Sequence, residues 1–232
     1  MTNIAENLAR LTTLMRSYEK KYERPVGAVS LLAASKQQSI EKMMTAFQAG
    51  QRAFGENYAQ EAIAKQAALL SLDKSTAAIE WHFIGNIQQN KTRQIAEHFA
   101  WVHSVTDLKT LVRLDAQRPA SLPPLNICIQ IKFDRQSQGC DKTIDALSAL
   151  TQACQSLTRL RLRGLMMMPP PSDDFETQRR IFHQLSLLWQ SLKEAYATLD
   201  TLSAGMSSDF EAAIAEGSTI IRIGTALFGK RL

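Results

Sequence analysis

Cysteine is scarce in this sequence, which has only Cys128, Cys140 and Cys154 among its 232 residues. Their number is odd, and none has the CxxC or cysteine–histidine spacing of a zinc site. The sequence therefore predicts neither a disulfide framework nor a metal site, and no Ser/His/Asp arrangement is recognisable. Cys128 alternates with apolar residues over 125–129, so we interpret it as a small hydrophobic residue of a buried strand.

Long apolar runs and blocks of one charge are also absent. No run reaches the length of a membrane-spanning helix, and residues 1–10 lack the apolar core of a signal peptide. We therefore expect a soluble, cytoplasmic protein without membrane contact. The net charge of +5 favours anionic ligands. The positive residues are scattered and lack interleaved aromatics, which argues against a dedicated nucleic-acid surface.

Strand-like and helix-like segments alternate along the whole chain. Eight segments are typical of β-strands, at 29–36, 52–58, 79–85, 101–105, 125–131, 160–168, 201–203 and 219–223. Each is followed by a helix or helical turn, and no linker divides the chain. This pattern predicts an α/β fold, a single (β/α)8 or TIM barrel over residues 1–232, with a doubly wound open sheet as the alternative. An extra amphipathic helix over 2–22, capped by Thr2 or Asn3, is expected to cover the bottom or side of the barrel.

The first strand ends at Lys36. Its apolar residues predict a strand buried on both faces, and Ser39 is a suitable N-cap for the helix that follows. Lys36 is therefore expected at the carboxyl end of a strand, the edge where parallel α/β folds bind ligands. A lysine in such a place can act as a nucleophile toward an aldehyde. An ordinary solvated loop lysine fits the same pattern.

Two turns of small residues follow the last two strands. They are Gly205-Met206-Ser207 and Ile223-Gly224-Thr225. Barrels commonly bind phosphate at this place through backbone N–H groups. Ser207 also precedes a short predicted helix over 209–216, and a helix N-terminus favours an anion. Each motif is common by itself, so the prediction of an anion site depends on their shared position.

Four further residues near strand ends could bind a ligand or fill the core. Arg222 lies in an apolar strand, where its guanidinium needs a partner. That partner is either a ligand's ring nitrogen or phosphate, or an internal acid such as Glu56. Asn57 follows the second strand and can hydrogen-bond a ligand oxygen. We interpret His82 and His103 as hydrogen-bonded core residues rather than as bases.

Seven motifs, spread over almost the whole chain, are long enough together to be specific. They are ASK at 34–36, FGENYAQE at 54–61, WHFIGNIQQNK at 81–91, VHSV at 102–105, RGLM at 163–166, GMSSD at 205–209 and GSTIIRIGTALFG at 217–229. In this order they resemble the pyridoxal phosphate homeostasis protein family. That family is similar to the N-terminal barrel of alanine racemase and binds pyridoxal 5'-phosphate (PLP) as an internal aldimine.

The resemblance implies a role for each candidate residue. Lys36 would hold the aldehyde carbon of PLP, and Ser207, Gly224 and Thr225 would cradle its phosphate. Asn57 would line the site near the ring.

Arg222 would face the pyridine nitrogen and keep it unprotonated, which makes the ring a weaker electron sink. Racemases of this fold carry a second domain that supplies the opposing acid or base, and this chain ends soon after its eighth strand. We therefore expect a monomeric PLP-binding protein that buffers the cofactor or delivers it to PLP-dependent apoenzymes, without strong catalytic activity. The alternatives are a small PLP enzyme such as an amino-acid racemase, and a nucleic-acid or protein-interaction module.

The sequence departs from the family pattern in three places. Gln38 and Ser137 stand where many bacterial members have lysines, and Lys230-Arg231 keeps the basic tail only in part. Those lysines are candidates for cofactor hand-over. Their replacement leaves the Lys36 site intact and puts a transfer route through them in doubt.

Overall fold

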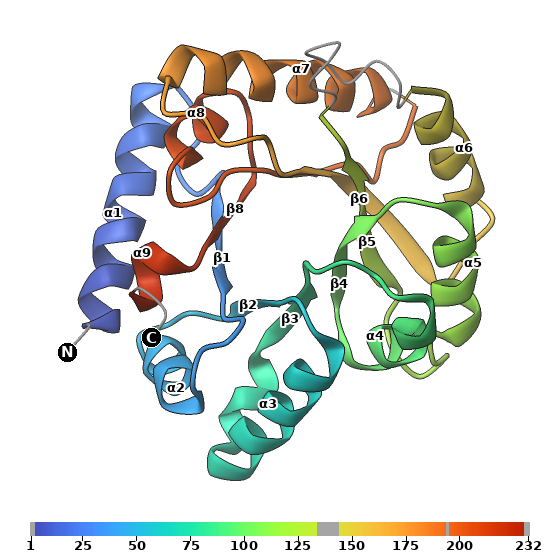
Figure 1. Ribbon diagram of the computed structural model, residues 1–232, viewed down its shortest axis with the longest axis horizontal. Coiled ribbons are helices and arrows are strands. Elements are labelled where there is room, and N and C mark those ends of the chain that lie inside the picture. The colour runs from blue at the N-terminus through green and yellow to red at the C-terminus, as the bar shows by residue number, and fades with distance from the viewer. Residues whose placement is uncertain (1–2, 134–143, 194, 230–232) are drawn as a thin grey trace.

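Eight parallel strands close into a barrel in the computed structural model, which describes residues 3–133, 144–193 and 195–229. Each strand pairs with its neighbours in the sequence, and β8 pairs with β1 to close the ring (Figure 1). The predicted (β/α)8 barrel is thus confirmed, and the open-sheet alternative is wrong. The strands are β1 (Ser30–Ala34), β2 (Ala53–Glu56), β3 (Glu80–Phe83), β4 (Trp101–Val105), β5 (Leu125–Ile131), β6 (Leu160–Met167), β7 (Thr201–Ser203) and β8 (Ile220–Ile223).

Helices surround the ring of strands on all sides (Figure 1). They are α1 (Ile4–Lys21), α2 (Ile40–Gln48), α3 (Ala59–Leu72), α4 (Thr92–His98), α5 (Leu108–Gln117), α6 (Ile144–Cys154), α7 (Phe175–Lys193), α8 (Phe210–Ala215) and α9 (Thr225–Phe228), with 3₁₀ turns at Lys74–Ala78 and Gln89–Lys91. The sequence pattern over 174–199 predicts one long helix, but α7 ends at Lys193. The chain leaves the helix in turns, and the Asp200 N–H then donates to Arg163 O, which brings β7 beside β6.

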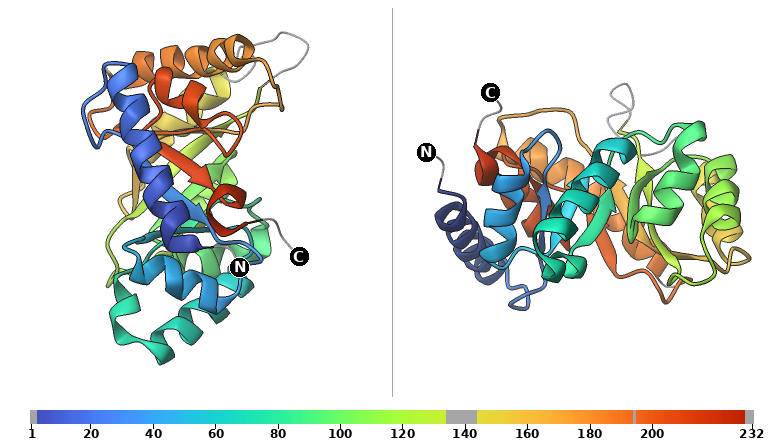
Figure 2. Two further views of the ribbon diagram at one scale, coloured as in Figure 1. Left: turned by 90° about the vertical axis from the view of Figure 1, so that its left-hand side faces the viewer. Right: turned by 90° about the horizontal axis from the view of Figure 1, so that it is seen from below.

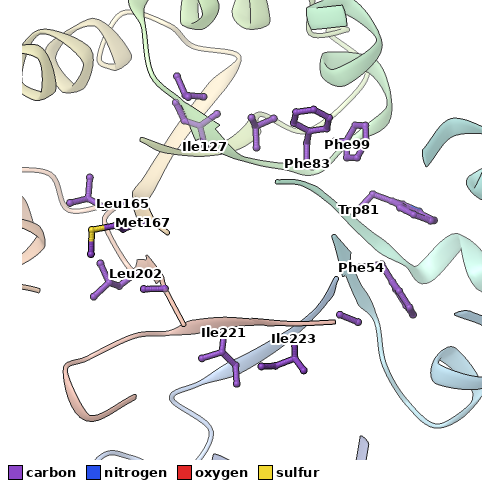
Figure 3. Packing of buried hydrophobic residues seen from close by; sticks show 14 of the residues in the cluster. Phe54, Trp81, Phe83, Phe99, Ile127, Leu165, Met167, Leu202, Ile221 and Ile223 are labelled. Carbon is purple, nitrogen blue, oxygen red and sulfur yellow. The ribbon is translucent and has the colours of Figure 1, made fainter. Parts of the chain in front are cut away.

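Most of the apolar core lies between the strands and the helices. Figure 3 shows outward-facing strand residues such as Phe54, Trp81 and Ile221 pointing away from the centre of the ring. A separate cluster of Trp101, Cys128 and Met166 is much smaller. Cys128 is fully buried, as predicted, and burial raises the pKa of its thiol to about 12.

The first strand is less buried than its sequence predicts. Leu32 and Ala33 are buried, but Ser30 is exposed and Leu31 and Ala34 are half-buried. The prediction of burial on both faces is therefore wrong at the strand's ends. The physical reason is that both ends border cavities, one at each mouth of the barrel.

The N-terminal helix α1 lies on the side of the barrel, against α8 and α9 (Figure 2). Its cap is Asn3, whose side chain accepts from the Glu6 N–H, whereas Thr2 lies outside the described residues. Glu19 of α1 is fully buried and accepts hydrogen bonds from the N–H groups of Gly27 and Val29, at 2.9 and 2.8 Å. One helical carboxylate thus fixes the loop that leads into β1.

Candidate functional site

A cavity of about 440 Å³ lies at the carboxyl ends of the strands. Its wall comes from the ends of β1, β2, β3, β6, β7 and β8 and the loops that follow them. All six residues proposed from the sequence line it: Lys36, Asn57, Ser207, Arg222, Gly224 and Thr225. Residues far apart in the sequence are brought together because parallel strands direct all their carboxyl ends to one mouth.

The loop that carries Lys36 is fixed on both sides. Ser35 is fully buried, and its hydroxyl donates to the Glu56 carboxylate at 2.6 Å. The N–H of Gln37 donates to Glu61 Oε1 at 2.7 Å. Gln37 has a φ of +59°, a left-handed conformation that costs a non-glycine residue energy. The flanking contacts therefore hold this conformation and the position of Lys36.

A buried lysine of α3 ties these contacts together. Lys65 Nζ lies 2.8 Å from Glu56 Oε1 and 2.6 Å from Glu61 Oε1, and it also donates to Ser35 O at 2.8 Å. Burial raises the pKa of Glu56 although Lys65 and Ser35 oppose the shift. Lys65 was missed from the sequence. The one available signal was its position four residues after Glu61, the last residue of the motif at 54–61. The same i,i+4 spacing is typical of an ordinary ion pair on a helix surface.

Arg222 reaches the cavity from β8 and is held by oxygens of Ser203 and Met167. Its Nη1 donates to O and Oγ of Ser203, at 2.6 and 2.7 Å, and its Nη2 donates to Met167 O at 2.8 Å. Burial lowers the pKa of Arg222 to about 10, a shift that Asp209 opposes. The proposed internal ion pair with Glu56 is wrong, because β2 turns that carboxylate outward toward the lysine of α3.

The two small-residue turns lie side by side, since the Arg222 N–H donates to Gly205 O at 2.9 Å. Gly205 has a φ of +99°, and a Cβ there would lie 2.7 Å from Ala213 Cβ. Glycine is therefore required in the turn that presents Ser207. The second turn, Gly224-Thr225, opens α9 at the same mouth. Hydroxyls and turn N–H groups form a donor set that suits an anion.

Asn57 has an unmatched polar atom at the cavity. Its Oδ1 is buried and has no hydrogen-bond partner. The residue packs tightly against the loop after β3, because a Cβ on Gly85 would lie 2.1 Å from Asn57 O. The backbone of Asn57 is thus held at the cavity wall by the loop after β3.

A smaller cavity of about 240 Å³ adjoins this wall and shares Asn57 and Asn86 with it. Tyr58, Gln88 and Lys91 line its outer part. Its residues come from two separate βα loops, and their spacing along the chain gives no sign of this second cavity.

Gln38, which replaces a family lysine, is buried beside the site rather than in its wall. Its Oε1 accepts from Lys42 Nζ at 3.1 Å, and Lys42 also donates to Phe228 O. Lys42 of α2 therefore links Gln38 to the end of α9. The other two departures, Ser137 and Lys230-Arg231, lie outside the described residues.

The two core histidines are hydrogen-bonded, as predicted. His82 Nδ1 lies 2.9 Å from His103 Nε2, and both rings are buried inside the barrel. Over residues 3–133, 144–193 and 195–229, no group of three or more His, Cys, Asp or Glu residues could hold a metal ion. No helix in the same ranges has the length and apolar character needed to cross a membrane.

The model of the alanine racemase N-terminal domain family matches residues 1–231. The pyridoxal phosphate homeostasis protein of Pseudomonas aeruginosa is 48% identical, over 100% of this chain and 97% of its own length. The Escherichia coli K12 protein of the same name is 43% identical, over 100% of this chain and 98% of its own. The chain belongs to the pyridoxal phosphate homeostasis protein family.

Among solved structures, this protein is similar to a relative whose structure contains PLP. PipY of Synechococcus elongatus, with PLP bound, superposes with a TM-score of 0.79 at 36% identity, over 97% of this chain and 100% of PipY. Alanine racemase from Bacillus anthracis has a TM-score of 0.70 at 14% identity, over 99% of this chain and 56% of the racemase. The second likeness shows a shared fold only.

Proposed function

We propose that this protein is a cytoplasmic PLP-binding protein that buffers the cofactor and delivers it to PLP-dependent apoenzymes. The observation that carries the proposal is the gathering of Lys36, Arg222 and the two small-residue turns on one cavity wall. The 48% identical homeostasis protein and the PLP-bound PipY structure support it.

The residues of the cavity fit PLP. Lys36 would hold the aldehyde carbon, and Ser207, Gly224 and Thr225 would bind the phosphate. Arg222 would donate to the ring nitrogen from a position set by its contacts with Ser203 and Met167. Asn57 would line the site near the ring.

The same wall supports a carrier better than an enzyme. Bound PLP supplies an electron-withdrawing ring, and a guanidinium beside the ring nitrogen weakens that property. Among the described residues that line the cavity, none carries a carboxyl, imidazole, phenol or thiol group. A racemase needs such a group to move a proton on the face opposite the lysine. Incubation with alanine or serine should therefore give no racemisation above background.

Borohydride trapping tests the lysine directly. The purified protein with PLP should show a visible absorption band that disappears on reduction, and peptide mapping should find the pyridoxyl mass on Lys36. Lys36→Ala should lose the band and the mass. Lys109→Ala, on the exposed side of α5, is the matched control and should keep both. A pyridoxyl mass on another lysine, or a protein that cannot be reconstituted with PLP, would contradict the proposal.

A transfer assay separates delivery from buffering. PLP-loaded protein is mixed with a PLP-dependent apoenzyme in the presence of a phosphatase that destroys free PLP. Delivery predicts that the apoenzyme regains activity despite the phosphatase, whereas free PLP at the same concentration fails to activate it. Equal loss of activation in both reactions would leave buffering as the function.

A further inference from the structure

A line of polar side chains crosses the inside of the barrel and ends at the candidate cofactor cavity. Starting from Arg222, the Nη1 donates to Ser203 Oγ at 2.7 Å. Ser203 Oγ lies 2.8 Å from His103 Nδ1, and His103 Nε2 lies 2.9 Å from His82 Nδ1. At the other end, His82 Nε2 lies 3.1 Å from Glu80 Oε1 in a contact not aligned as a hydrogen bond.

These residues join the two mouths of the barrel. Arg222 lines the upper cavity, whereas His82 and Glu80 line a depression of about 380 Å³ at the amino-terminal end of the strands. The side chains of Ser203 and both histidines have no more than 3% exposure, whereas that of Glu80 is 47% exposed. Water therefore cannot substitute for a missing partner in the middle of the line.

The Glu80 end sets the direction of the line. The carboxylate carries no proton and lies 3.1 Å from His82 Nε2, so an unprotonated ring nitrogen would be repelled there. The proton of His82 is therefore assigned to Nε2, which makes His82 Nδ1 an acceptor. His103 Nε2 must then donate to His82, which leaves His103 Nδ1 to accept from the Ser203 hydroxyl. Ser203 Oγ in turn accepts from Arg222, which can only donate. One arrangement satisfies each contact, with both imidazoles neutral and protonated on Nε2.

The electrostatics of the barrel interior agree with neutral imidazoles. Burial lowers the pKa of His82, and burial together with the neighbouring His82 ring and the positive charge of Arg222 holds the pKa of His103 well below its ordinary value. A second positive charge in this line would repel the guanidinium, so neutrality keeps Arg222 stable beside them.

We propose that Ser203 and His103, backed by His82, are positioning residues that hold the Arg222 guanidinium in one orientation toward the bound ligand. That the ligand is PLP rests on the proposed function. Without the Ser203 hydroxyl, His103 Nδ1 loses its donor and Arg222 Nη1 keeps only the backbone oxygen. The guanidinium then samples more than one orientation, which weakens its contact with a ring nitrogen.

The first test needs no ligand. Nitrogen-15 NMR of the PLP-free protein should show His82 and His103 neutral and protonated on Nε2 at pH 7. The side-chain signals of Arg222 should be sharp in the wild-type protein and exchange-broadened in Ser203→Ala. A charged imidazole, an Nδ1 proton, or Arg222 signals unchanged in Ser203→Ala would overturn the proposal, whether or not the protein binds PLP.

The second test measures the ligand contact. Ser203→Ala should bind PLP about 10-fold more weakly, the loss expected for one hydrogen bond to a charged group. The absorption band of the bound cofactor should also change its pH midpoint, and Ser203→Thr, which keeps the hydroxyl, should restore both. Thr201→Val is the matched control, since Thr201 lies on the same strand but its hydroxyl bonds Asp200. Unchanged affinity and pH midpoint in Ser203→Ala would overturn the positioning role, whereas absent PLP binding in the wild type would refute the proposed function instead.

Discussion

Ser35 and Gln37, the two neighbours of Lys36, are both tied to groups that Lys65 holds in place. Glu56 is fully buried, and Lys65 is its only described ion-pair partner over residues 3–133, 144–193 and 195–229. Removing one member of a buried pair leaves the other charge uncompensated, which costs more than the pair itself contributes. At the scale of single residues, the lysine at the cavity therefore depends on a second lysine outside it.

Replacing Lys65 should damage stability and the site together. Lys65→Met is expected to lower the free energy of unfolding by about 3–5 kcal/mol, because the Glu56 carboxylate stays buried without its partner. PLP occupancy should fall as the Lys36 loop loosens. Denaturant unfolding and the absorption band of bound PLP measure the two effects.

Two further variants test whether the unpaired Glu56 charge causes the loss of stability in Lys65→Met. Lys65→Met combined with Glu56→Gln should recover part of the lost stability, since the double variant buries no unpaired charge. Lys109→Met, on the exposed face of α5, should match the wild type in both measurements. If Lys65→Met unfolds at the wild-type denaturant concentration, the ion pairs do not hold the loop.

The sequence allowed the six cavity residues to be chosen because each stands at a strand end or in a turn, and strand ends are visible as changes of pattern. The sequence did not reveal which side chains contact one another. Glu56 and Lys65 meet because β2 turns one face outward onto α3, and the line from Arg222 to His82 needs the register of four strands. Such contacts depend on three-dimensional packing that spacing along one chain does not encode.

Among the elements, α1 is attached to the barrel by a buried carboxylate. Burial alone would raise the pKa of Glu19, but Arg16 and the N–H groups of Gly27 and Val29 hold it below its usual value. A carboxyl whose pKa is lower in the folded state stabilises the protein above its unfolded pKa of about 4.3. That contribution is lost as the pH falls through the folded pKa.

Glu19→Gln should therefore destabilise the protein in a pH-dependent way. At pH 7 the loss is expected to be about 1.5–3 kcal/mol, the range for hydrogen bonds to a charged group. The difference from the wild type should shrink as the pH falls below the unfolded pKa and then through the lower pKa of the folded carboxyl, because the wild-type Glu19 then becomes protonated as well. Urea unfolding at pH 7, 5 and 3.5 gives the comparison.

Glu6→Gln, on the exposed first turn of the same helix, is the control and should change stability by less than about 0.5 kcal/mol at each pH. A Glu19→Gln defect that is the same at pH 7 and pH 3.5 would show that packing, not charge, attaches α1.

The apolar stripe of this helix predicted two possible positions, the bottom or the side of the barrel, and the helix lies on the side. The contacts with α8 and α9 that decide it come from the far end of the chain.

For the whole molecule, the cavity joins the first and last strands of the barrel. Lys36 follows β1, and Arg222 and Thr225 belong to or follow β8, which pairs with β1. A ligand that contacts residues at the ends of both β1 and β8 can bind only when the barrel is closed. Binding should therefore stabilise the global fold and not one loop.

PLP should raise the melting temperature of the PLP-free protein. At 100 times its dissociation constant, a ligand specific for the folded state adds about 2.7 kcal/mol. For a chain of this size that corresponds to roughly 5–10 °C. Differential scanning calorimetry measures the shift, and Lys36→Ala should show a much smaller one. Equal shifts in both proteins would mean that PLP binds elsewhere.

The pairing of β1 with β8 also bears on how the protein is made. Ser30 and Ile220 are register partners although almost the whole chain separates them. On a ribosome, β1 emerges early and must wait for β8 before the ring can close, so the nascent chain has Lys36 but no completed cavity. Long-range pairing of this kind is slow because the intervening chain must first be ordered. The cofactor can therefore enter only after synthesis of the last strand, as the final step of maturation rather than as a guide to folding.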